Sequence, residues 1–210
     1  MCDNRGMISV RSKLIWTFVA VGAALAGLWL ARELHSPEPQ LASGTWLPQP
    51  RELGNFSLLD EMGRPFTLRE LQGRPTLVFF GFTHCPDVCP TTLATLTQAR
   101  KTAAVAGLRV LLVSVDPARD TPAVLEKYVH AFDSDTRGAT GTPAEIGRIA
   151  REFSVAVQRV DLPNGDYTMD HSAAVFLLDD RARMVGIFTP PFEAKPLAAD
   201  LRRAAPRLES

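Results

Sequence analysis

Short, continuously apolar runs alternate along the chain with longer segments in which polar and apolar residues are mixed. This pattern is typical of strands that are covered on both faces and separated by helices. Two runs stand out, TLVFFGF at residues 76–82 and RVLLVSV at residues 109–115. A third run, AAVFLL at residues 173–178, is followed by an Asp-Asp-Arg turn and a short apolar segment at residues 184–188. Weaker patterns predict further strands at residues 56–59, 66–68 and 155–160.

Helix start signals lie between several of these strands. Thr121 is a capping residue directly before Pro122, and proline is favoured at the first position of a helix. Thr142 and Glu145 form a capping box at the start of another helix. Helices are predicted at residues 90–106, 122–132, 143–153 and 195–204. The resulting order, with strand–helix–strand units first and a hairpin and helix last, predicts an α/β protein with a thioredoxin-like fold.

The N-terminal part of the chain differs in composition from the rest. Residues 14–31 are uncharged and mostly apolar, and the run is long enough for a transmembrane helix, which needs about 17–25 residues. Basic residues precede it, namely Arg5, Arg11 and Lys13, so the positive-inside rule places the N-terminus in the cytoplasm. We therefore expect a single-pass protein of the bacterial inner membrane with its soluble domain in the periplasm. A cleaved signal peptide is the alternative interpretation.

These boundaries divide the chain into four predicted parts. Residues 1–13 form a cytoplasmic tail, and residues 14–31 form the transmembrane helix. Residues 32–52 form a linker, because prolines are frequent there and favour a semi-extended spacer. Residues 53–210 form the thioredoxin-like domain.

Composition and charge narrow the choice of function. Hydrophobic residues make up 46% of the chain and charged residues 22%, which is typical of a globular protein with a core. Lys and Arg together number 23, as do Asp and Glu, so the formal net charge is zero and nucleic-acid binding is not expected. The cysteines are Cys2, Cys85 and Cys89, too few for a fold held together by disulfides. Cys2 lies in the charged N-terminal tail and is interpreted as incidental.

Cys85 and Cys89 occur in the segment FGFTHCPDVCP, where a predicted buried strand ends and a predicted helix begins. α/β folds place their functional sites at this edge of the sheet. Residues four apart face the same side of a helical turn. Pro90 makes the first turn irregular or delays the helix start, and in either case the free N–H groups there favour the thiolate form that binds metals. A structural disulfide is the alternative, although closing so short a loop stabilises a domain little.

His171 is the predicted third ligand. It lies in the sequence MDHS, just before the strand predicted at residues 173–178. In a thioredoxin-like fold, the loop entering that strand lies against the cysteine loop and usually carries a proline, which is absent here. Two thiolates and an imidazole form a soft, three-coordinate site that suits Cu(I). Zinc, with a water molecule as its fourth ligand, is the alternative.

The other polar residues near these motifs have weaker signals. Asp87 lies within the cysteine loop and Asp170 beside the histidine, and each is predicted either to tune the metal from outside its ligand shell or to be a solvated turn residue. His84 precedes the first cysteine, but neighbouring side chains on an extended segment point opposite ways. Asp116 and Asp120, in VDPARDTP, are interpreted as turn and helix-entry residues rather than as an acid–base pair.

Four motifs together resemble the Sco/SenC family of copper chaperones, namely GFTHCPDVCP, SVDPARDTP, GATGTP and DYTMDHS. The resemblance covers roughly residues 50–205, all of the predicted soluble domain. It implies a thioredoxin-like fold anchored by one transmembrane helix, with copper bound by the cysteines of a CxxxC motif and a distal histidine. Those roles fall on Cys85, Cys89 and His171. The family helps to assemble the dinuclear copper centre of cytochrome c oxidase, so the resemblance implies copper delivery, reduction of the target's cysteines, or both.

The resemblance implies a carrier of copper, as Cu(I) or Cu(II), rather than an enzyme. The implied partners are the copper-accepting subunit of cytochrome c oxidase and, as a second candidate, another periplasmic copper chaperone. The alternative function is a thiol–disulfide oxidoreductase, in which Cys85 and Cys89 form a redox-active disulfide that keeps the cysteines of a copper-accepting protein reduced. The CxxxC spacing and the missing proline count against this enzyme. A thiol peroxidase is disfavoured because Phe82 and Pro86 occupy the positions where its threonine is expected.

Overall fold

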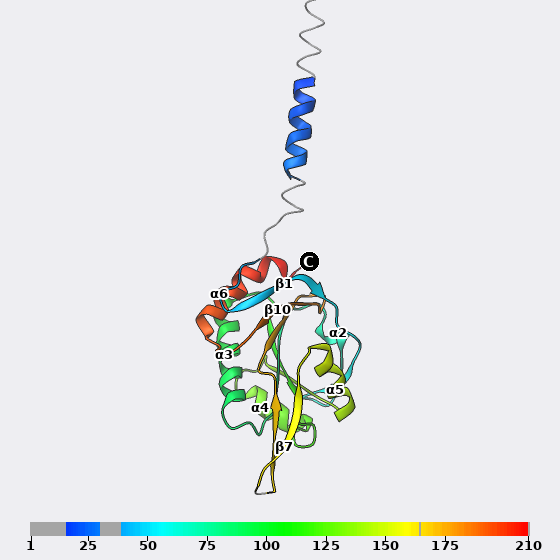
Figure 1. Ribbon diagram of the computed structural model, residues 1–210, viewed down its shortest axis with the longest axis vertical. Coiled ribbons are helices and arrows are strands. Elements are labelled where there is room, and N and C mark those ends of the chain that lie inside the picture. The colour runs from blue at the N-terminus through cyan, green and yellow to red at the C-terminus, as the bar shows by residue number, and fades with distance from the viewer. Residues whose placement is uncertain (1–15, 30–38, 164, 210) are drawn as a thin grey trace, which may run out of the picture. The chain divides into compact units, whose positions relative to one another are not determined.

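The computed structural model describes residues 16–29, 39–163 and 165–209 (Figure 1). The chain divides into two units, residues 1–38 and residues 39–210, and each is described by itself. In the first unit, the described residues form a helix at 16–29. No helix among the described residues is both long enough and apolar enough to cross a bilayer. The predicted anchor at 14–31 begins and ends outside the described residues, and the predicted cytoplasmic tail with Cys2 lies outside them entirely.

Within the described residues, the second unit is built on a mixed sheet of eight strands in the order β1-β10-β9-β4-β5-β6-β2-β3. At its centre, β4 (Thr76–Gly81) and β5 (Arg109–Ser114) run parallel, and every residue in both strands is buried. β6 (Arg137–Thr140) extends the parallel ladder, and β9 (Val175–Leu178) pairs with β4 in the antiparallel sense. The two clearest apolar runs are therefore confirmed as central strands that are covered on both faces.

Antiparallel strands complete both edges of the sheet. β10 (Met184–Phe188) pairs with β9, and β1 (Gly44–Arg51) pairs with β10 as an edge strand. At the other edge, β2 (Ser57–Asp60) pairs with β6 and with β3 (Pro65–Thr67). The strands predicted at residues 56–59 and 66–68 are thus confirmed, with their ends shifted by one residue, and they lie at the edge of the sheet.

A separate hairpin consists of β7 (Val157–Asp161) and β8 (Tyr167–His171), which form a two-stranded sheet of their own. Figure 1 shows this hairpin extending past the end of the domain. β7 matches the strand predicted at residues 155–160, apart from a shift of its ends. β8 has no counterpart in the sequence prediction, which places these residues in the loop before the strand at 173–178. Tyr167, Met169 and His171 alternate with the polar Thr168 and Asp170, and this alternation is the signal that indicates the strand.

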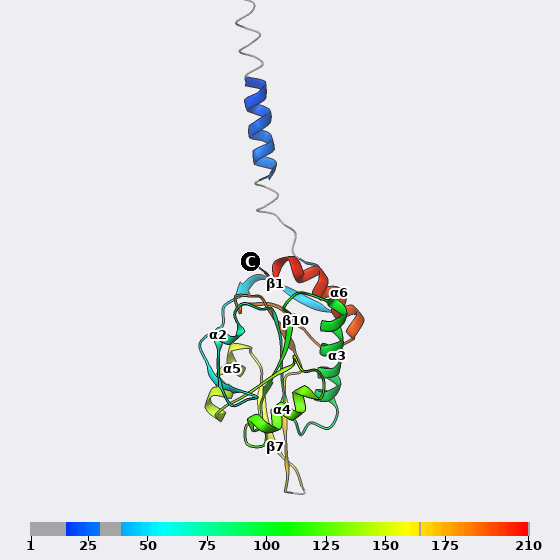
Figure 2. The same cartoon turned by 180° about the vertical axis from the view of Figure 1, so that it is seen from behind.

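Helices cover both faces of the sheet. Their bounds are α2 (Leu68–Leu71), α3 (Val88–Ala103), α4 (Pro122–His130), α5 (Pro143–Glu152), α6 (Ala194–Ala204) and the 3-10 helix η1 (Ala205–Arg207). α3 and α6 lie side by side on one face, and α5 lies on the other (Figures 1 and 2). The predicted N-cap residues are confirmed, because the side chains of Thr121 and Thr142 accept hydrogen bonds from the backbone N–H groups of Val124 and Glu145. The capping box predicted for Thr142 and Glu145 is only half formed, because the Glu145 carboxylate accepts a hydrogen bond of 2.9 Å from the Ser57 N–H instead.

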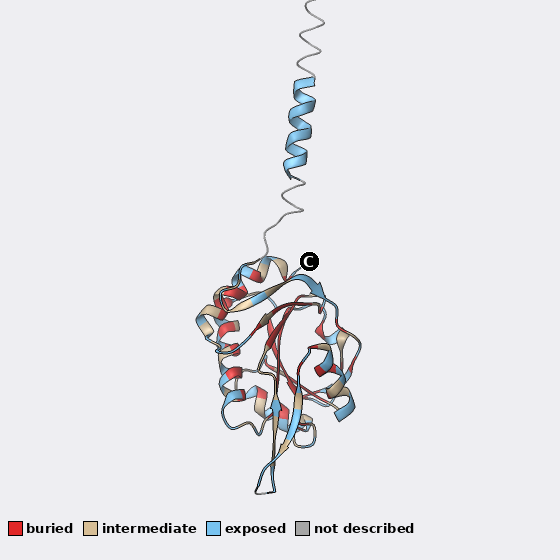
Figure 3. Ribbon diagram, viewed as in Figure 1, coloured by how far each residue is buried: buried red, intermediate tan, exposed pale blue. Residues whose placement is uncertain are grey.

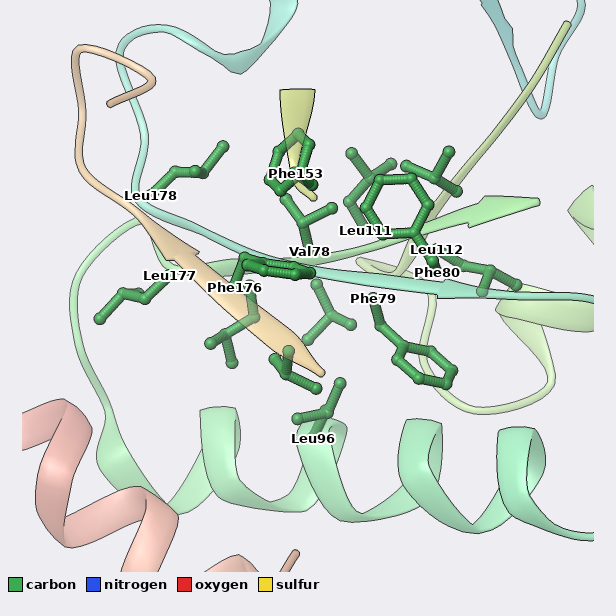
Figure 4. Packing of buried hydrophobic residues seen from close by; sticks show 14 of the residues in the cluster. Val78, Phe79, Phe80, Leu96, Leu111, Leu112, Phe153, Phe176, Leu177 and Leu178 are labelled. Atoms are coloured by element: carbon green, nitrogen blue, oxygen red, sulfur yellow. The ribbon is translucent and has the colours of Figure 1, made fainter. Parts of the chain in front are cut away.

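The core follows the central strands and the inner faces of the helices (Figure 3). On one face, the ring of Phe80 contacts Phe153 at a centroid distance of 5.2 Å and Phe176 at 6.1 Å. Phe79 points to the opposite face, on the side of α3 where Leu96 lies (Figure 4). Burial of each such side chain stabilises the fold by about 1.5–3 kcal/mol. Because both faces are filled, the carboxyl end of β4, which leads into the cysteine loop, is held firmly.

The start of the folded unit differs from the sequence prediction. Residues 44–51 lie within the predicted linker at 32–52, yet the structure has them as β1. The register of β1 on β10 shifts midway along the strand, where Pro48 and Pro50 fall. Proline lacks the N–H that a ladder requires, and it is tolerated where an edge strand makes no bond at that position. The folded unit therefore begins before residue 53, the predicted boundary.

A buried carboxylate fastens the segment that leads into β1. Asp200 of α6 is fully buried and accepts hydrogen bonds from the Ala42 N–H at 2.8 Å, the Ser43 N–H at 2.7 Å and the Ser43 hydroxyl at 2.6 Å. Arg203 Nη1 donates to the same carboxylate at 2.7 Å. Burial by itself raises the pKa of Asp200, but the hydrogen bonds together outweigh it and hold the pKa below its usual value.

We expect Asp200→Asn to destabilise the protein by about 2 kcal/mol at pH 7, because an amide is a weaker acceptor than a carboxylate for these buried donors. A carboxyl group whose pKa falls on folding stabilises the protein above its unfolded pKa of about 3.9, and this contribution is lost as the pH falls through the folded pKa. The difference from the parent should therefore shrink below about pH 4. Urea unfolding on both sides of that pH measures the effect, with Asp135→Asn, at an exposed carboxylate, as the control. Equal stability of the parent and Asp200→Asn at neutral pH would contradict the expectation.

Candidate metal centre

The loop from β4 to α3 is fixed by a buried carboxylate. Thr83 donates two hydrogen bonds to Asp120, from its backbone N–H at 3.0 Å and from its hydroxyl at 2.6 Å. Asp120 is fully buried and also accepts a hydrogen bond of 2.6 Å from the hydroxyl of Ser114, the last residue of β5. The course of the loop just before Cys85 is thus tied to the ends of the two central strands.

Cys85 and Cys89 lie on either side of the helix start. Cys89 is in the first turn of α3 and is fully buried, whereas Cys85 precedes the helix and is half-buried. The backbone N–H of Cys89 donates a hydrogen bond to Sγ of Cys85 at 3.4 Å. α3 begins at Val88, so Pro90 falls in the first turn, where a missing N–H costs no helical bond. Both cysteines are free thiols in this structure.

His171, the last residue of β8, faces the buried cysteine. Its Nε2 lies 3.8 Å from Sγ of Cys89. Its Nδ1 lies 3.1 Å from the carbonyl oxygen of Ser172, so in the neutral ring Nδ1 carries the proton and Nε2 presents its lone pair to the sulfur. The rings of Phe79 and Phe82 contact the imidazole edge-on, each at a centroid distance of 6.1 Å. One hydrogen bond and two aromatic rings therefore orient this side chain.

Burial governs the electrostatics of the pair. It raises the pKa of the Cys89 thiol to about 12, so the thiol keeps its proton at neutral pH. The thiolate predicted from the helix start is therefore wrong for Cys89 without a metal ion, because burial outweighs the effect of the helix N-terminus. Burial also lowers the pKa of His171 below its usual value, against smaller opposing effects of the Ser172 carbonyl and Asp170. The imidazole is therefore neutral at pH 7, which is the form that binds metals. A metal ion that binds here displaces the proton of Cys89 but none from Nε2 of His171.

The separation of the two ligand atoms fits a shared metal ion. Metal–sulfur and metal–nitrogen bonds of about 2.3 and 2.0 Å, at angles of about 110–120°, place the sulfur and nitrogen about 3.5–3.7 Å apart. The observed separation between Cys89 Sγ and His171 Nε2 is 3.8 Å, close to that range. Among the described residues, no three His, Cys, Asp or Glu side chains form a complete metal-binding group. The structure brings Cys89 and His171 together directly, and it places the Cys85 sulfur against the Cys89 amide.

Asp87 and Asp170, which the sequence predicts either to tune a metal ion from outside its ligand shell or to be solvated turn residues, lie at the surface. Asp87 is exposed at the N-cap of α3, where its side chain makes no capping hydrogen bond. Asp170 is exposed on β8, and its charge raises the pKa of the neighbouring imidazole against the larger effect of burial. His84 is also exposed, and its Nδ1 lies 3.1 Å from the Thr83 hydroxyl and 3.9 Å from Asp120. His84 thus contacts the anchor of the cysteine loop.

The segment between β5 and α4 is interpreted from the sequence as a turn and a helix entry. In the structure it also contacts the β7–β8 hairpin, which carries His171. Asp116 is 2% exposed and accepts a hydrogen bond of 2.9 Å from the hydroxyl of Tyr167 on β8. Arg119 stacks its guanidinium on the Tyr167 ring, 3.7 Å from the ring centre. The interpretation of Asp116 and Asp120 is therefore correct for their place in the chain but incomplete, because both buried carboxylates hold neighbouring segments in place.

Gly81, the last residue of β4, allows the buried thiol to approach the backbone. A Cβ atom at this position would lie 2.9 Å from Cε1 of Phe79, 3.1 Å from Sγ of Cys89 and 3.2 Å from Cδ1 of Leu112. These distances are shorter than ordinary van der Waals contacts. Glycine is therefore required here while Cys89 keeps its place.

Comparison with known proteins agrees with these observations. The SCO1/SenC family model matches residues 46–206. The mitochondrial protein SCO2 homolog of Bos taurus is 33% identical over 201 residues, covering 92% of this chain and 75% of that protein. Two solved structures with copper bound are similar, ScoI of Arabidopsis thaliana (TM-score 0.71, 31% identity, 74% of this chain and 98% of that chain) and ScoI of Bradyrhizobium japonicum (TM-score 0.66, 40% identity, 72% and 98%). These matches confirm the predicted α/β, thioredoxin-like fold class.

We expect Cys85 to react with iodoacetamide before Cys89 in the reduced protein. Cys89 is fully buried and its thiol pKa is about 12, whereas Cys85 is half-buried. Because the thiolate is the reacting form, the rate at Cys85 should exceed that at Cys89 by at least about tenfold. Mass spectrometry of peptides after brief alkylation measures both rates. Equal modification of the two cysteines would contradict the burial of Cys89.

Gly81→Ala should destabilise the protein by about 1–3 kcal/mol, the usual effect of overpacking, because the new methyl group displaces Cys89 or Phe79. Gly147→Ala in α5 is the matched control, since a Cβ atom there would lie 3.5 Å from its nearest neighbour, the Arg151 guanidinium. Urea unfolding of both variants measures the difference. If Gly81→Ala is as stable as the parent, the close packing around the thiol is wrong.

Proposed function

This chain belongs to the SCO1/SenC family, and on that premise we propose that it is a copper metallochaperone that binds copper through Cys85, Cys89 and His171. Proteins of this family handle copper during the assembly of cytochrome c oxidase. The proposed role of this chain is to assist assembly of the dinuclear copper centre of that oxidase. The observation that carries the proposal is the 3.8 Å approach of His171 Nε2 to Cys89 Sγ from distant parts of the sequence.

The donor atoms favour copper over other ions. Two sulfur atoms and an imidazole nitrogen are soft ligands, which suit Cu(I). The solved relatives that contain copper support the same cargo here. Zinc, the alternative ion, takes a fourth ligand in sites of this kind. Asp87 and Asp170, both exposed near the ligands, are proposed to adjust the charge around the bound ion.

Copper and a proton compete for the sulfur of Cys89, and this competition favours transfer of the copper ion to another protein. Because burial keeps Cys89 protonated at neutral pH, copper must displace that proton in order to bind. His171 contributes its lone pair without losing a proton, since its imidazole is already neutral. Cys85 is the half-buried sulfur, so a ligand from an acceptor approaches the bound ion on the Cys85 side. The ligands are then exchanged one at a time.

The proposed acceptor is the copper-accepting subunit of cytochrome c oxidase, and another periplasmic copper chaperone is the candidate donor. The proposed location is the periplasmic side of the bacterial inner membrane, with residues 14–31 as a single-pass anchor. The uncharged run at these positions and the basic residues before it support this location.

Thiol–disulfide exchange is a second candidate function. It is favoured by the two free thiols, one half-buried and one fully buried, at the start of the same helix. In this reaction the Cys85 thiolate attacks a disulfide of the copper-accepting protein, and Cys89 then displaces the mixed disulfide and releases the reduced acceptor. The reaction leaves Cys85 and Cys89 oxidised and makes no use of His171.

The purified and reduced protein should bind about one Cu(I) per chain through its three ligands. Under a competing chelator, His171→Ala should bind at least about 100-fold more weakly, because even groups that only orient metal ligands contribute about 10–100-fold. His130→Ala, at an exposed histidine at the end of α4, is the matched control and should keep the parent's affinity.

Negligible copper in the parent protein, or equal affinities of the parent and His171→Ala, would overturn the proposed site. The reduction potential of the Cys85–Cys89 pair then becomes the informative measurement. A potential that is the same in His171→Ala and in the parent, together with reduction of an acceptor disulfide, would favour the second function.

A further inference from the structure

The segment between β5 and α4, residues 116–120, contributes no ligand to the proposed site. We infer that Arg119 in this segment is a positioning residue, which holds the β7–β8 hairpin so that His171 faces Cys89. The inference rests on the proposed function, because it gives Arg119 a role in copper binding that acts through His171 rather than through contact with the ion.

The hairpin requires a fastening of this kind. β7 and β8 form their own two-stranded sheet, and in the described part of the chain no strand pairing joins them to the eight-stranded sheet. His171 lies at one end of their ladder, opposite Val157, and Tyr167 lies at the other end, opposite Asp161. The position of His171 relative to the cysteines therefore depends on the short segments that join the hairpin to α5 and β9 and on side-chain contacts between the hairpin and the rest of the domain.

Arg119 is fixed to the domain through Asp116. Its Nε donates to Asp116 Oδ2 at 2.5 Å, and Asp116 is 2% exposed. The backbone N–H of Asp116 donates to the Ser114 hydroxyl at 3.0 Å, and the Asp120 N–H donates to the Asp116 carbonyl at 2.9 Å. The carboxylate that holds Arg119 thus belongs to the same turn that anchors the cysteine loop through Asp120.

On its other side, Arg119 reaches β8. Its Nη1 donates to the Tyr167 carbonyl at 3.0 Å and to the Asp166 carboxylate at 3.3 Å, and its Cζ lies 3.7 Å from the Tyr167 ring centre. The Tyr167 hydroxyl donates to Asp116 Oδ1 at 2.9 Å, so a single carboxylate binds both the arginine and the tyrosine. A guanidinium group makes these contacts together because it is planar, carries several N–H donors and stacks on aromatic rings.

Two routes connect Arg119 to the imidazole. Tyr167 and His171 lie on the same strand at an even spacing, so their side chains share one face of the hairpin. Arg119 Cζ also lies 6.0 Å from the centre of the Phe82 ring, which contacts the imidazole edge-on at 6.1 Å. The Arg119 side chain is 17% exposed and that of Asp116 3%, so salt screens this ion pair less than it screens the contact with the exposed Asp166.

Arg159 offers a matched control on the same ring. Its Cζ also lies 3.7 Å from the Tyr167 ring centre, so the two guanidinium groups must occupy opposite faces of the ring. The Nε of Arg159 donates to Asp161 on its own strand at 2.9 Å, and its side chain is 56% exposed. Removal of either arginine therefore loses a stacking contact. Removal of Arg119 also loses its hydrogen bonds to Asp166 and to the Tyr167 carbonyl, so the Tyr167–Asp116 hydrogen bond is left to join this part of the hairpin to the buried turn.

The test is a Cu(I) competition measured on the full chain for the parent and for Arg119→Met, Arg159→Met, His171→Ala and the double variant Arg119→Met/His171→Ala. Arg119→Met should weaken binding by about 10–100-fold, the range found for groups that orient metal ligands, and Arg159→Met by less than about twofold. In the His171→Ala background, Arg119→Met should change binding by less than about twofold, because no imidazole is left to position.

Hydrogen exchange of the copper-free protein gives a second readout. The amides of residues 167–171 should exchange faster in Arg119→Met than in the parent or in Arg159→Met, while those of β4 and β5 stay protected. If Arg119→Met does not fold, Arg119→Lys takes its place. Arg119→Lys keeps the positive charge but loses the planar guanidinium group with its several N–H donors. It should therefore also bind Cu(I) more weakly, and exchange the amides of residues 167–171 faster, than Arg159→Met.

Equal weakening by Arg119→Met with and without His171, or equal effects of Arg119→Met and Arg159→Met, would overturn the inference. The proposed function is judged separately, from the parent and His171→Ala. A parent that binds no copper overturns the function and, with it, the positioning role. Copper binding that is lost in His171→Ala but unchanged in Arg119→Met overturns the positioning role alone.

Discussion

A buried negative charge at the carboxyl ends of β4 and β5 organises the candidate metal centre. Asp120 is fully buried, and an ionised carboxylate in such a position is tolerated only when hydrogen-bond donors surround it. Thr83 supplies two of these donors and Ser114 a third. The charge is satisfied when the loop before Cys85 takes its observed course. Formation of the core and placement of the thiols are therefore coupled.

The other half of the centre is held in a different way. The cysteines follow a strand that is packed on both faces, whereas His171 arrives on a hairpin that forms its own small sheet. The rings of Phe79 and Phe82 lie where these parts meet, and they orient the imidazole while its Nε2 stays directed at Cys89. One half, with the thiols, is packed firmly into the domain, and the other half, with the imidazole, lies on a separate hairpin. This arrangement suits the proposed function, in which the site both binds and releases an ion.

Local signals account for the parts of this arrangement that the sequence predicts. The runs at 76–82 and 109–115 indicate β4 and β5, because a strand buried on both faces needs a continuous series of apolar residues. β1 is not predicted from the sequence, because its prolines indicate a linker, whereas an edge strand tolerates them. The proposed ligands belong to recognisable motifs. Arg119, in contrast, contacts the Tyr167 carbonyl across 48 residues of sequence, and no local pattern predicts such a contact.

Cys89 and His171 are 82 residues apart in the chain, which gives the proposed bound ion a second effect. An ion held by both residues is a cross-link between the cysteine loop and the hairpin. A ligand that binds the folded chain alone shifts the balance between folded and unfolded forms toward the folded one. With the proposed ion bound, the chain would therefore open less often than without it. A protease that cleaves the opened chain would then degrade the ion-free form first. Delivery of the ion would then also shorten the lifetime of the molecule that delivered it.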